Sequence, residues 1–419
     1  MPTGTTGLRL ACYGWVDEHA GSLASANHLV LAELLRRGVE VDFYANRRHV
    51  PFPPGLAGEG FRYLAVDPPR SLGVLPDRGQ RMANWALAPW VRRAWRRRFG
   101  PLVEREHAAA PYDALVTLST PPAFTIPGVP TVAWLQGPLQ TELEAVRRLR
   151  RQIVRTSGRA FYAALVAYYR TDVLLDRFVL RECERIICGS RWAQAAVARR
   201  GYPAERSSAL PYPVDLDVFR PPPQGRDPGP PTLLSLGRLD PRKRLDLLLD
   251  AFALVLDQVP DARLRIVGRP GYAPRQLSLL DRFARRDRVD YEPAVPRHEV
   301  VPLLQQATVL VQPSENENFG TAVAEALACG TPVVVGPSNG TADYIDGHSR
   351  RFSDYAPEAV SAAVLETIAS VRSRPAEVCA SARSAAERWF STSSVVDGLI
   401  GVVAETGADH RLDRRRTHR

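Results

Sequence analysis

The most constraining feature of this chain is an alternation of short apolar runs with longer helical patterns. The runs LRLACYGWV, VEVDFYA, YDALVTLS, PTVAWLQ and RIICGS lie in the first half, and the segment SANHLVLAELLRRG has apolar residues at helical spacing. A strand, a crossover helix and a second strand in this order build parallel α/β sheets. The first half is therefore predicted to contain a parallel sheet with helices on its faces.

A proline-rich segment interrupts this alternation, and the pattern then starts again. Residues 211–231 contain eight prolines, a density that excludes regular secondary structure and suits a stiff connection between domains. The runs PTLLSLGRL, ARLRIVG, RVDYEPAV, ATVLVQPS and TPVVVG follow it, with helical patterns between them. The sequence thus predicts an α/β protein of two Rossmann-like parallel-sheet domains that face each other across a ligand-binding cleft.

The domain boundaries are predicted from the same segments. We expect an N-terminal domain over residues 1–212, a linker over residues 213–231 and a C-terminal domain over residues 232–390. Residues 391–408 are predicted to form a helix that crosses back to the first domain. Residues 409–419 are expected to form a charged, irregular tail.

Composition excludes several classes of function. The net charge of +10 arises in the first half, because residues 1–220 hold 30 basic and 20 acidic residues. No nucleic-acid-binding motif accompanies this charge, so nucleic acid is not an expected partner, whereas anionic membranes and anionic substrates are. The five cysteines lack metal-ligand spacing, and we find no signal peptide or membrane-spanning run. These features predict a cytoplasmic protein, with peripheral binding to the inner membrane face as a further candidate.

Two glutamates in PSENENFGTAVAEALACGTPVVVG form the sharpest local signal. Glu317 falls in the loop after a strand, and Glu325 falls in the early part of the next helix. The first backbone N–H groups of that helix, from Phe319 to Ala322, offer an anion site, and carboxylates beside it can accept hydrogen bonds from sugar hydroxyls. The alternative is that Glu325 offsets the helix dipole and Glu317 is solvated.

A second signal contains the single lysine among 55 basic residues. In SLGRLDPRKRLDLL, Gly237 and Arg238 end a strand, an Asp-Pro turn follows, and Lys243 begins a helix. Arg238 could bind a diphosphate in fork geometry, and Lys243 could bind it as a compact point charge. A lysine retained in so arginine-rich a chain indicates that a planar guanidinium does not fit at this position. The alternative is a solvated charge cluster at the start of a helix.

These segments resemble the retaining GT-B glycosyltransferases of the family 4 group, over nearly the whole chain. HAGSLASAN is similar to the family's Gly-rich first loop, and CERIICGSRWAQAAVARRGYPAERSSALPYPVDLDVFRP is similar to its last N-domain strand, Ser-bearing loop and interdomain link. GRLDPRKRLDLLLDAF is similar to the diphosphate motif, and Glu317 with Glu325 to the E-x7-E motif. The resemblance implies that the N-terminal domain binds the acceptor and the C-terminal domain the nucleotide sugar.

The resemblance also implies a role for each matched residue. Arg238, Lys243 and Glu317 would be the catalytic residues, with the two cations on the donor diphosphate and Glu317 on hydroxyls of the transferred sugar. Glu325 would hold the nucleotide ribose. The implied donor-binding residues are Gly21, Gly237, Arg238, Lys243, Glu317, Asn318, Phe319, Gly320, Thr321 and Glu325.

Some positions depart from the family pattern. Gln136 stands in WLQGP where the family often has a histidine, and it can bond a sugar hydroxyl but cannot take up a proton. Ser190 is expected to line the acceptor or sugar side of the cleft with Gln136, or alternatively to cap a helix. Tyr212-Pro213 stands in the linker where the family usually has Asn-Gly, and Pro293 stands where it has a glycine near the expected base pocket. Pro293 leaves the identity of the nucleobase open.

The activity implied is transfer of a glycosyl group from a UDP- or GDP-sugar, with retention at the anomeric carbon, no metal and no cofactor besides this co-substrate. The acceptor stays open between a lipid-linked molecule, a glycan and a small natural product. Two alternatives stay open: a sugar phosphorylase or epimerase on the same fold, and a catalytically degenerate nucleotide-sugar-binding protein. Related enzymes dock on anionic membranes through basic patches, for which the arginines from Arg92 to Arg98 and from Arg147 to Arg170 are candidates.

Overall fold

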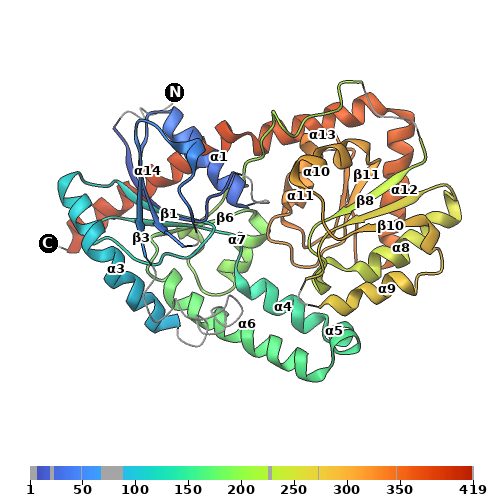
Figure 1. Ribbon diagram of the computed structural model, residues 1–419, viewed down its shortest axis with the longest axis horizontal. Helices are drawn as coiled ribbons and strands as arrows, with labels where there is room; N and C mark the ends of the chain where they lie inside the picture. Colours follow the sequence, from blue (N-terminus) through green and yellow to red (C-terminus); the bar gives the residue numbers. More distant parts are fainter. Residues whose placement is uncertain are drawn as a thin grey trace. The chain divides into compact units, whose positions relative to one another are not determined.

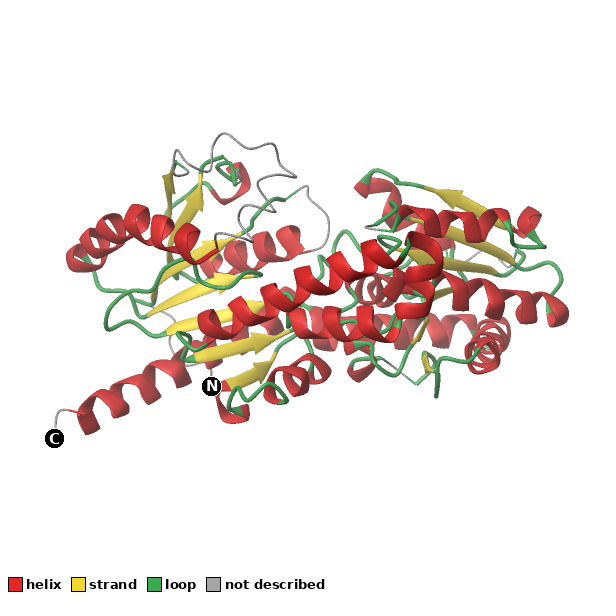
Figure 2. Ribbon diagram, turned by 90° about the horizontal axis from the view of Figure 1, so that it is seen from below, coloured by secondary structure: helices red, strands yellow, loops and turns green. Residues whose placement is uncertain are grey.

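The structure of the chain is a computed structural model that describes residues 7–18, 23–48, 50–67, 88–224, 229–271, 273–345 and 347–417. The chain divides into two compact units, each with its own parallel sheet (Figure 2). The first unit contains Met1–Leu139, Tyr168–Pro213 and Thr392–Arg419, and the second contains Gln140–Ala167 and Val214–Ser391. The predicted fold class, an α/β protein with two parallel-sheet domains, is confirmed.

Within the described residues, the first unit holds seven parallel strands in the order β3-β2-β1-β4-β5-β6-β7 (Figure 1). The strands are β1 (Arg9–Gly14), β2 (Glu40–Asn46), β3 (Phe61–Val66), β4 (Ala114–Leu118), β5 (Thr131–Leu135), β6 (Arg185–Cys188) and β7 (Ser207–Ala209). Every residue of β4 and of β5 is buried, as expected for central strands covered on both faces. The sequence did not predict β3 and β7, because these edge strands need no continuous apolar run.

The helices of the first unit cover both faces of this sheet. They are α1 (Leu23–Arg36), α3 (Ala88–Ala109), the C-terminal part of α6 (Arg159–Leu180), α7 (Arg191–Ala198) and α14 (Thr392–Thr417), with the short turns η1 (Pro54–Leu56) and η3 (Ala204–Arg206). Helix α1 ends where the sequence predicts, because Gly38 adopts a φ of +77° that favours glycine.

The last helix, α14, packs against α1 of the same unit. Arg37 contacts Asp397, and its Nη2 donates to Ser393 Oγ at 2.9 Å. The irregular tail expected over residues 409–419 is wrong as far as Thr417, because α14 continues to that residue (Figure 2). No glycine or proline follows Gly407, so nothing in the sequence ends the helix earlier.

Within the described residues, the second unit holds six parallel strands in the order β10-β9-β8-β11-β12-β13. The strands are β8 (Thr232–Leu236), β9 (Arg263–Val267), β10 (Val289–Glu292), β11 (Val309–Gln312), β12 (Val333–Val335) and β13 (Arg350–Arg351). Its helices are α4 (Leu139–Arg148), α5 (Arg150–Ser157), the N-terminal part of α6, α8 (Leu245–Gln258), α9 (Ser278–Asp281), α10 (Arg297–Gln306), α11 (Thr321–Ala328), α12 (Pro357–Ser373) and α13 (Pro375–Phe390). Its short turns are η4 (Pro241–Lys243), η5 (Pro274–Leu277), η6 (Arg286–Arg288) and η7 (Gly340–Asp343).

The apolar face of α8 belongs to the core of the second unit. Leu248, Phe252 and Val255 recur at helical spacing and are buried in one cluster with Leu264 of β9 and Val309 of β11. This packing fixes the start of α8, and hence the η4 turn before it, at the carboxyl end of β8.

The order of the second sheet reverses between β8 and β11. From β8 the chain continues outward through β9 and β10 on one side, and β11 lies on the other side. Ligands of open α/β sheets bind at the carboxyl ends of the strands at such a reversal. The η4 turn follows β8 and the loop into α11 follows β11, and the N–H of Glu315 donates to the carbonyl of Arg242 at 2.8 Å to join them. The candidate site is built at this point.

Candidate functional site

The η4 turn depends on glycines where two strands end. Gly237 has a φ of +133°, and its N–H donates to the carbonyl of Val267 at 2.9 Å. A Cβ on Gly268 would lie only 1.8 Å from the carbonyl oxygen of Gly237, so the two chain segments approach more closely than other residues allow. Arg244 then adopts a left-handed φ of +55° at the start of α8, held by ion pairs to Glu315 and Asp246. The turn therefore places three consecutive basic side chains, residues 242–244, at the carboxyl edge of the sheet.

Arg238 is exposed but anchored. Its Nε donates to Asp240 Oδ2 at 2.6 Å, and Asp240 is only 1% exposed. About two thirds of the Arg238 side chain (64%) is accessible to solvent. A guanidinium held on one edge by a buried carboxylate keeps its other N–H groups for an anion.

Lys243 and Glu317 are brought together, although they are 74 positions apart in the sequence. Lys243 Nζ contacts Glu317 Oε2, and the same oxygen accepts from Arg242 Nη1 at 2.8 Å. The Glu317 side chain is only 7% exposed, which contradicts the solvated alternative. Although burial alone would raise it, the charges of Arg242 and Lys243 lower the pKa of Glu317 to about 2. Burial lowers the pKa of Lys243, against the charge of Glu317.

Arg242 is a site residue that sequence reasoning missed. It lies next to Lys243 in the same turn, and it contacts both Glu317 and Glu142 Oε1, the latter at 3.1 Å from Arg242 Nε. Adjacency to the single lysine was the signal that could have found Arg242. No comparable signal marks Glu142, because it lies 100 positions earlier in the chain.

The loop between β11 and α11 carries the other predicted residues. A Cβ on Gly320 would lie 2.6 Å from Gln312 Oε1, so the helix start requires glycine there. The ring of Phe319 is buried edge-on against Phe390, at 5.8 Å between centroids, so only its backbone is placed to face a ligand. Asn318 Oδ1 accepts from Thr141 Oγ1 at 3.1 Å. Thr321 begins α11 and is half-buried.

Glu325 lies in the middle of α11 and is 8% exposed. Its Oε1 lies 3.4 Å from both terminal nitrogens of Arg297, at the start of α10. Burial raises the pKa of Glu325, and the charge of Arg297 opposes this shift. Because Glu325 is not in the first turn, offsetting the helix dipole does not account for its position. No pattern in the sequence indicates that Arg297 is its partner.

Gln136 follows β5 in the first unit and is exposed. The strand end before it is fixed by Tyr212, whose hydroxyl donates to the carbonyl of Leu135 at 2.6 Å. The Tyr212 ring also stacks on Trp134, with centroids 5.0 Å apart and an interplanar angle of 7°. Tyr212, which departs from the family pattern, thus serves to hold the segment that presents Gln136.

Ser190 caps a helix, as the alternative for this residue proposed. Its Oγ accepts from the N–H of Ala193 at 3.1 Å, and the residue is fully buried. Its oxygen serves the first turn of α7, and the expectation that it lines a cleft stays a prediction. Gly21, expected beside the diphosphate, lies outside the described residues.

In the described part of the chain, no group of three histidine, cysteine, aspartate or glutamate side chains is arranged to hold a metal ion. In the same ranges, no helix combines the length and apolar character that crossing a membrane would need.

Family models match both halves of the chain. The model for Glycosyltransferase Family 4 matches residues 26–218, and the model for Glycosyl transferases group 1 matches residues 219–387. The two matches meet within the proline-rich segment.

Curated relatives are similar over part of their length. The chain is 31% identical over 229 residues to the GDP-mannose-dependent alpha-(1-6)-phosphatidylinositol dimannoside mannosyltransferase of Mycobacterium tuberculosis, covering 53% of this chain and 58% of that protein. It is 33% identical over 262 residues to the D-inositol 3-phosphate glycosyltransferase of Mycolicibacterium smegmatis, covering 56% of each. The chain thus spans little more than half the length of the curated relatives it matches.

Solved structures share the fold. Sucrose-phosphate synthase from Thermosynechococcus elongatus has a TM-score of 0.67 at 16% identity, covering 96% of this chain and all of that one. HepE of Anabaena, in complex with UDP and glucose, has a TM-score of 0.61 at 16% identity, covering 94% of this chain and 99% of that one. These likenesses agree with the two parallel sheets of this chain. The two family matches show that the chain belongs to the family 4 (group 1) glycosyltransferases, and its fold is GT-B.

Proposed function

We propose that this chain is a retaining glycosyltransferase that moves a sugar from a UDP- or GDP-sugar to an acceptor. The observation that carries the proposal is the meeting of Lys243 with Glu317 at the carboxyl ends of β8 and β11, beside the exposed Arg238. Fixed cations and a buried carboxylate at such a strand reversal suit an anionic, hydroxyl-rich ligand.

In this proposal the donor binds in the second unit. Arg238, held by Asp240, and Lys243 bind the diphosphate, Glu325 accepts from the ribose hydroxyls, and Glu317 orients the transferred sugar through its hydroxyls. UDP and GDP are proposed because similar proteins include a GDP-mannose-dependent enzyme and a structure in complex with UDP.

The proposed chemistry needs charge stabilisation more than a protein nucleophile. The bond between the anomeric carbon and the diphosphate breaks while the acceptor oxygen bonds to the same face of that carbon. The departing phosphate takes the acceptor's proton, and Arg238 and Lys243 stabilise the negative charge that develops on it. The proposal therefore invokes no metal and no residue that forms a covalent intermediate.

The configuration of the product tests this proposal. We expect incubation with UDP-glucose or GDP-mannose and an inositol phosphate acceptor to give a glycoside with the donor's anomeric configuration, read from the anomeric proton signal in NMR. Inositol phosphates are the first acceptors to try, because the relatives' names include inositol lipids and inositol phosphate. An inverted product would refute retention, and intact donor with every acceptor class would refute transfer.

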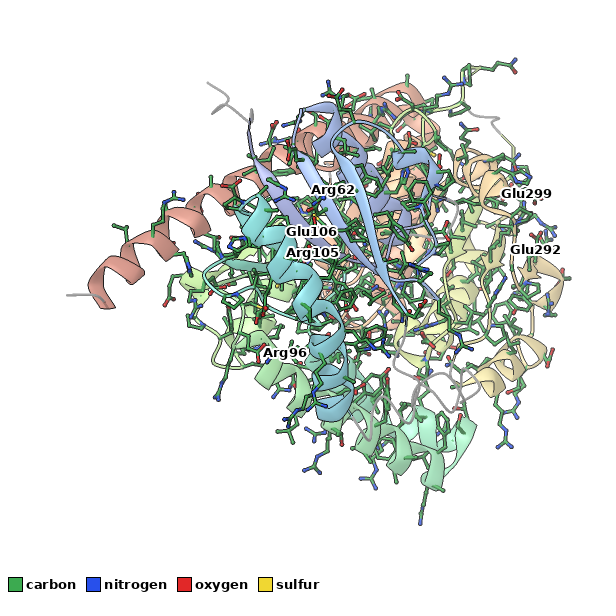
Figure 3. All side chains as sticks on the ribbon, turned by 60° about the vertical axis from the view of Figure 1, so that its left-hand side comes forward. Arg62, Arg96, Arg105, Glu106, Glu292 and Glu299 are labelled. Carbon is green, nitrogen blue, oxygen red and sulfur yellow. The ribbon has the colours of Figure 1, made fainter. Side chains whose placement is uncertain are left out.

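We also propose that an anionic membrane surface is a partner, in keeping with a lipid-linked acceptor. Residues 147–171 contain no acidic residue. Tyr168 and Leu174, on the part of α6 in the first unit, are 41% and 55% exposed, so apolar groups accompany Arg170 on that part of the helix. In the other predicted patch, Arg96 (labelled in Figure 3) pairs with Glu182, which reduces its free charge, and the side chain of Arg92 lies outside the described residues. The exposed arginines of the first patch are Arg147, Arg148, Arg150, Arg151, Arg155, Arg159 and Arg170.

Binding to vesicles tests the membrane proposal. Each basic side chain near an anionic surface contributes roughly 1 kcal/mol, so replacing Arg150, Arg151 and Arg155 of α5 by glutamine is expected to weaken binding to phosphatidylserine-containing vesicles about 100-fold at low salt. Co-sedimentation at increasing salt measures this loss.

A matched triple variant separates this patch from total charge. Its three arginines are also exposed, but they lie on β13, α12 and α13, away from α5. We expect it to bind vesicles like the wild type; equal losses in both triple variants, or binding that ignores anionic lipid, would refute the docking surface. The replaced residues are Arg351, Arg372 and Arg388.

A further inference from the structure

The first turn of α4 is attached to the loop that carries Glu317. Residues 140–167 follow β5 of the first sheet in the sequence, yet they cluster with the second unit. Thr141 Oγ1 donates to Asn318 Oδ1 at 3.1 Å, and Asn316 Nδ2 donates to the carbonyl of Thr141 at 3.0 Å. Arg148 at the end of the helix lies 3.5 Å from Glu315 Oε2. Helix α4, labelled in Figure 1, is therefore part of the candidate donor site.

This attachment brings a second carboxylate to the cations. Glu142 Oε1 lies 3.1 Å from Arg242 Nε, and Arg242 Nη1 donates to Glu317 Oε2 at 2.8 Å. The exposed fractions of the Glu142, Arg242 and Lys243 side chains are 18%, 12% and 18%. Two carboxylates thus neutralise two cations in a poorly solvated cluster. A diphosphate ester adds two negative charges to a cluster that has no excess positive charge.

Glu142 is the less strongly held of the two carboxylates. Glu317 contacts two cations through one oxygen, whereas Glu142 contacts Arg242, whose Nε–H is not aligned for a hydrogen bond. The charged groups that face Glu142 are Arg238, Arg242, Lys243 and Asp240 around η4 and Glu317 in the next loop. Burial raises the pKa of Glu142, with Glu317 and Asp240 adding to the shift and Arg242 and Lys243 opposing it.

On the basis of the donor site proposed above, we infer that Glu142 takes up a proton from solvent when the diphosphate of the nucleotide sugar binds. The diphosphate attracts the ammonium group of Lys243 and the guanidinium group of Arg242. Glu317 keeps its ion pairs with both cations. Glu142 then lies beside added negative charge in a poorly solvated place, where the neutral acid is the favoured form. Glu142 acts through Arg242 and is a positioning residue, and the proton returns to solvent when the nucleotide leaves.

Affinity for the donor is expected to depend on pH. Because donor binding is linked to proton uptake, affinity for the donor falls as the pH rises, by up to about tenfold per pH unit where one proton is taken up. Below the pKa of Glu142 in the free protein, the residue is already protonated and affinity no longer changes. The variant Glu142→Gln carries no titratable group there, so its affinity is independent of pH and exceeds that of the wild type at pH 8.

Calorimetry measures the proton directly. UDP-glucose and GDP-mannose are the probes, because their diphosphate esters do not titrate between pH 5 and 8. Titrations at one pH in buffers of different ionisation enthalpy give the number of protons exchanged. We expect uptake in the wild type and none in Glu142→Gln. Difference infrared spectra of the wild type should show a carboxylic acid C=O band that forms with the donor, which keeps the test decisive if the variant does not fold.

The control is Glu144→Gln on the same helix. Glu144 accepts a hydrogen bond from Gln140, and its variant is expected to take up the proton as the wild type does. Donor binding without proton uptake in the wild type, or uptake that persists in Glu142→Gln, would overturn the inference while leaving the donor site intact. If neither probe binds, the proposed donor site itself is wrong.

Discussion

Replacing Lys243 by alanine is expected to lower kcat/KM for glycosyl transfer by about 10²- to 10³-fold, the loss typical of removing one fixed stabiliser of developing charge. Little stability should be lost. Burial lowers the pKa of Lys243, so its charged form is costly to hold, and Glu317 keeps its partner Arg242 at 2.8 Å. Initial rates with the donor and the melting temperature of the same sample measure the two effects. A variant that transfers at the wild-type rate would remove Lys243 from the site.

The variant Lys243→Arg tests shape rather than charge. Lys243 lines a cavity of about 10 Å³ together with Gly237, Leu245 and Ser314, which is room for about one water molecule. A planar guanidinium needs more space than a compact ammonium, so we expect kcat/KM to fall by at least about tenfold while the melting temperature stays unchanged.

The control for this variant is Arg263→Lys. Arg263 lies on β9 in an exposed pair with Asp290, where lysine and arginine are interchangeable, so neither activity nor stability should change. Wild-type turnover in Lys243→Arg would mean that the site does not require a lysine at this position.

Replacing Glu317 by glutamine is expected to abolish most transfer and also to destabilise the second unit in a pH-dependent way. The pKa of this carboxyl is lowered from its ordinary value of 4.5 to about 2. A lowered pKa stabilises the fold at pH values above 4.5, and this contribution is lost as the pH falls toward 2. At about 1.4 kcal/mol per pKa unit, the lowering corresponds to about 3 kcal/mol. We therefore expect Glu317→Gln to be less stable than the wild type by about 3 kcal/mol at pH 6, with the difference shrinking toward pH 3.

Urea unfolding followed by circular dichroism at several pH values measures this difference. Glu299→Gln serves as the control, because Glu299 on α10 (labelled in Figure 3) is 53% exposed and its ion-pair partner, His298, lies 3.9 Å away. It should match the wild type at every pH. A difference between Glu317→Gln and the wild type that is the same at pH 6 and pH 3 would mean that the buried charge pairs do not carry the stability ascribed to them.

The sequence predicted those features that local pattern determines. Central strands such as β4 and β5 are continuous apolar runs because both faces are covered, whereas the edge strand β7 is short and polar and leaves no such pattern. The segments with Arg238, Lys243, Glu317 and Glu325 were found because each has a distinctive local order at a strand end. Their meeting could be expected, because the carboxyl ends of neighbouring parallel strands share one edge of a sheet.

The contacts made over long sequence distances could not be predicted. Glu142 reaches Arg242 only because residues 140–167 leave the first unit and pack on the second, which no local pattern announces. The pairing of Glu325 with Arg297 depends likewise on how α10 lies beside α11. Ser190 could not be assigned from the sequence for a different reason. A serine after a strand can cap the next helix or bind a ligand, and the local sequence does not show which hydrogen bonds its side chain makes.

Calorimetric titration of UDP-glucose and GDP-mannose into the wild type and into the double variant Lys243→Ala/Glu325→Ala tests the central claim most directly. The claim is that the residues gathered at the ends of β8 and β11 bind a nucleotide sugar. We predict saturable binding of at least one donor to the wild type and at least about 100-fold weaker binding to the folded double variant. Equal affinity in both proteins, or no binding of either donor to the wild type, would contradict it.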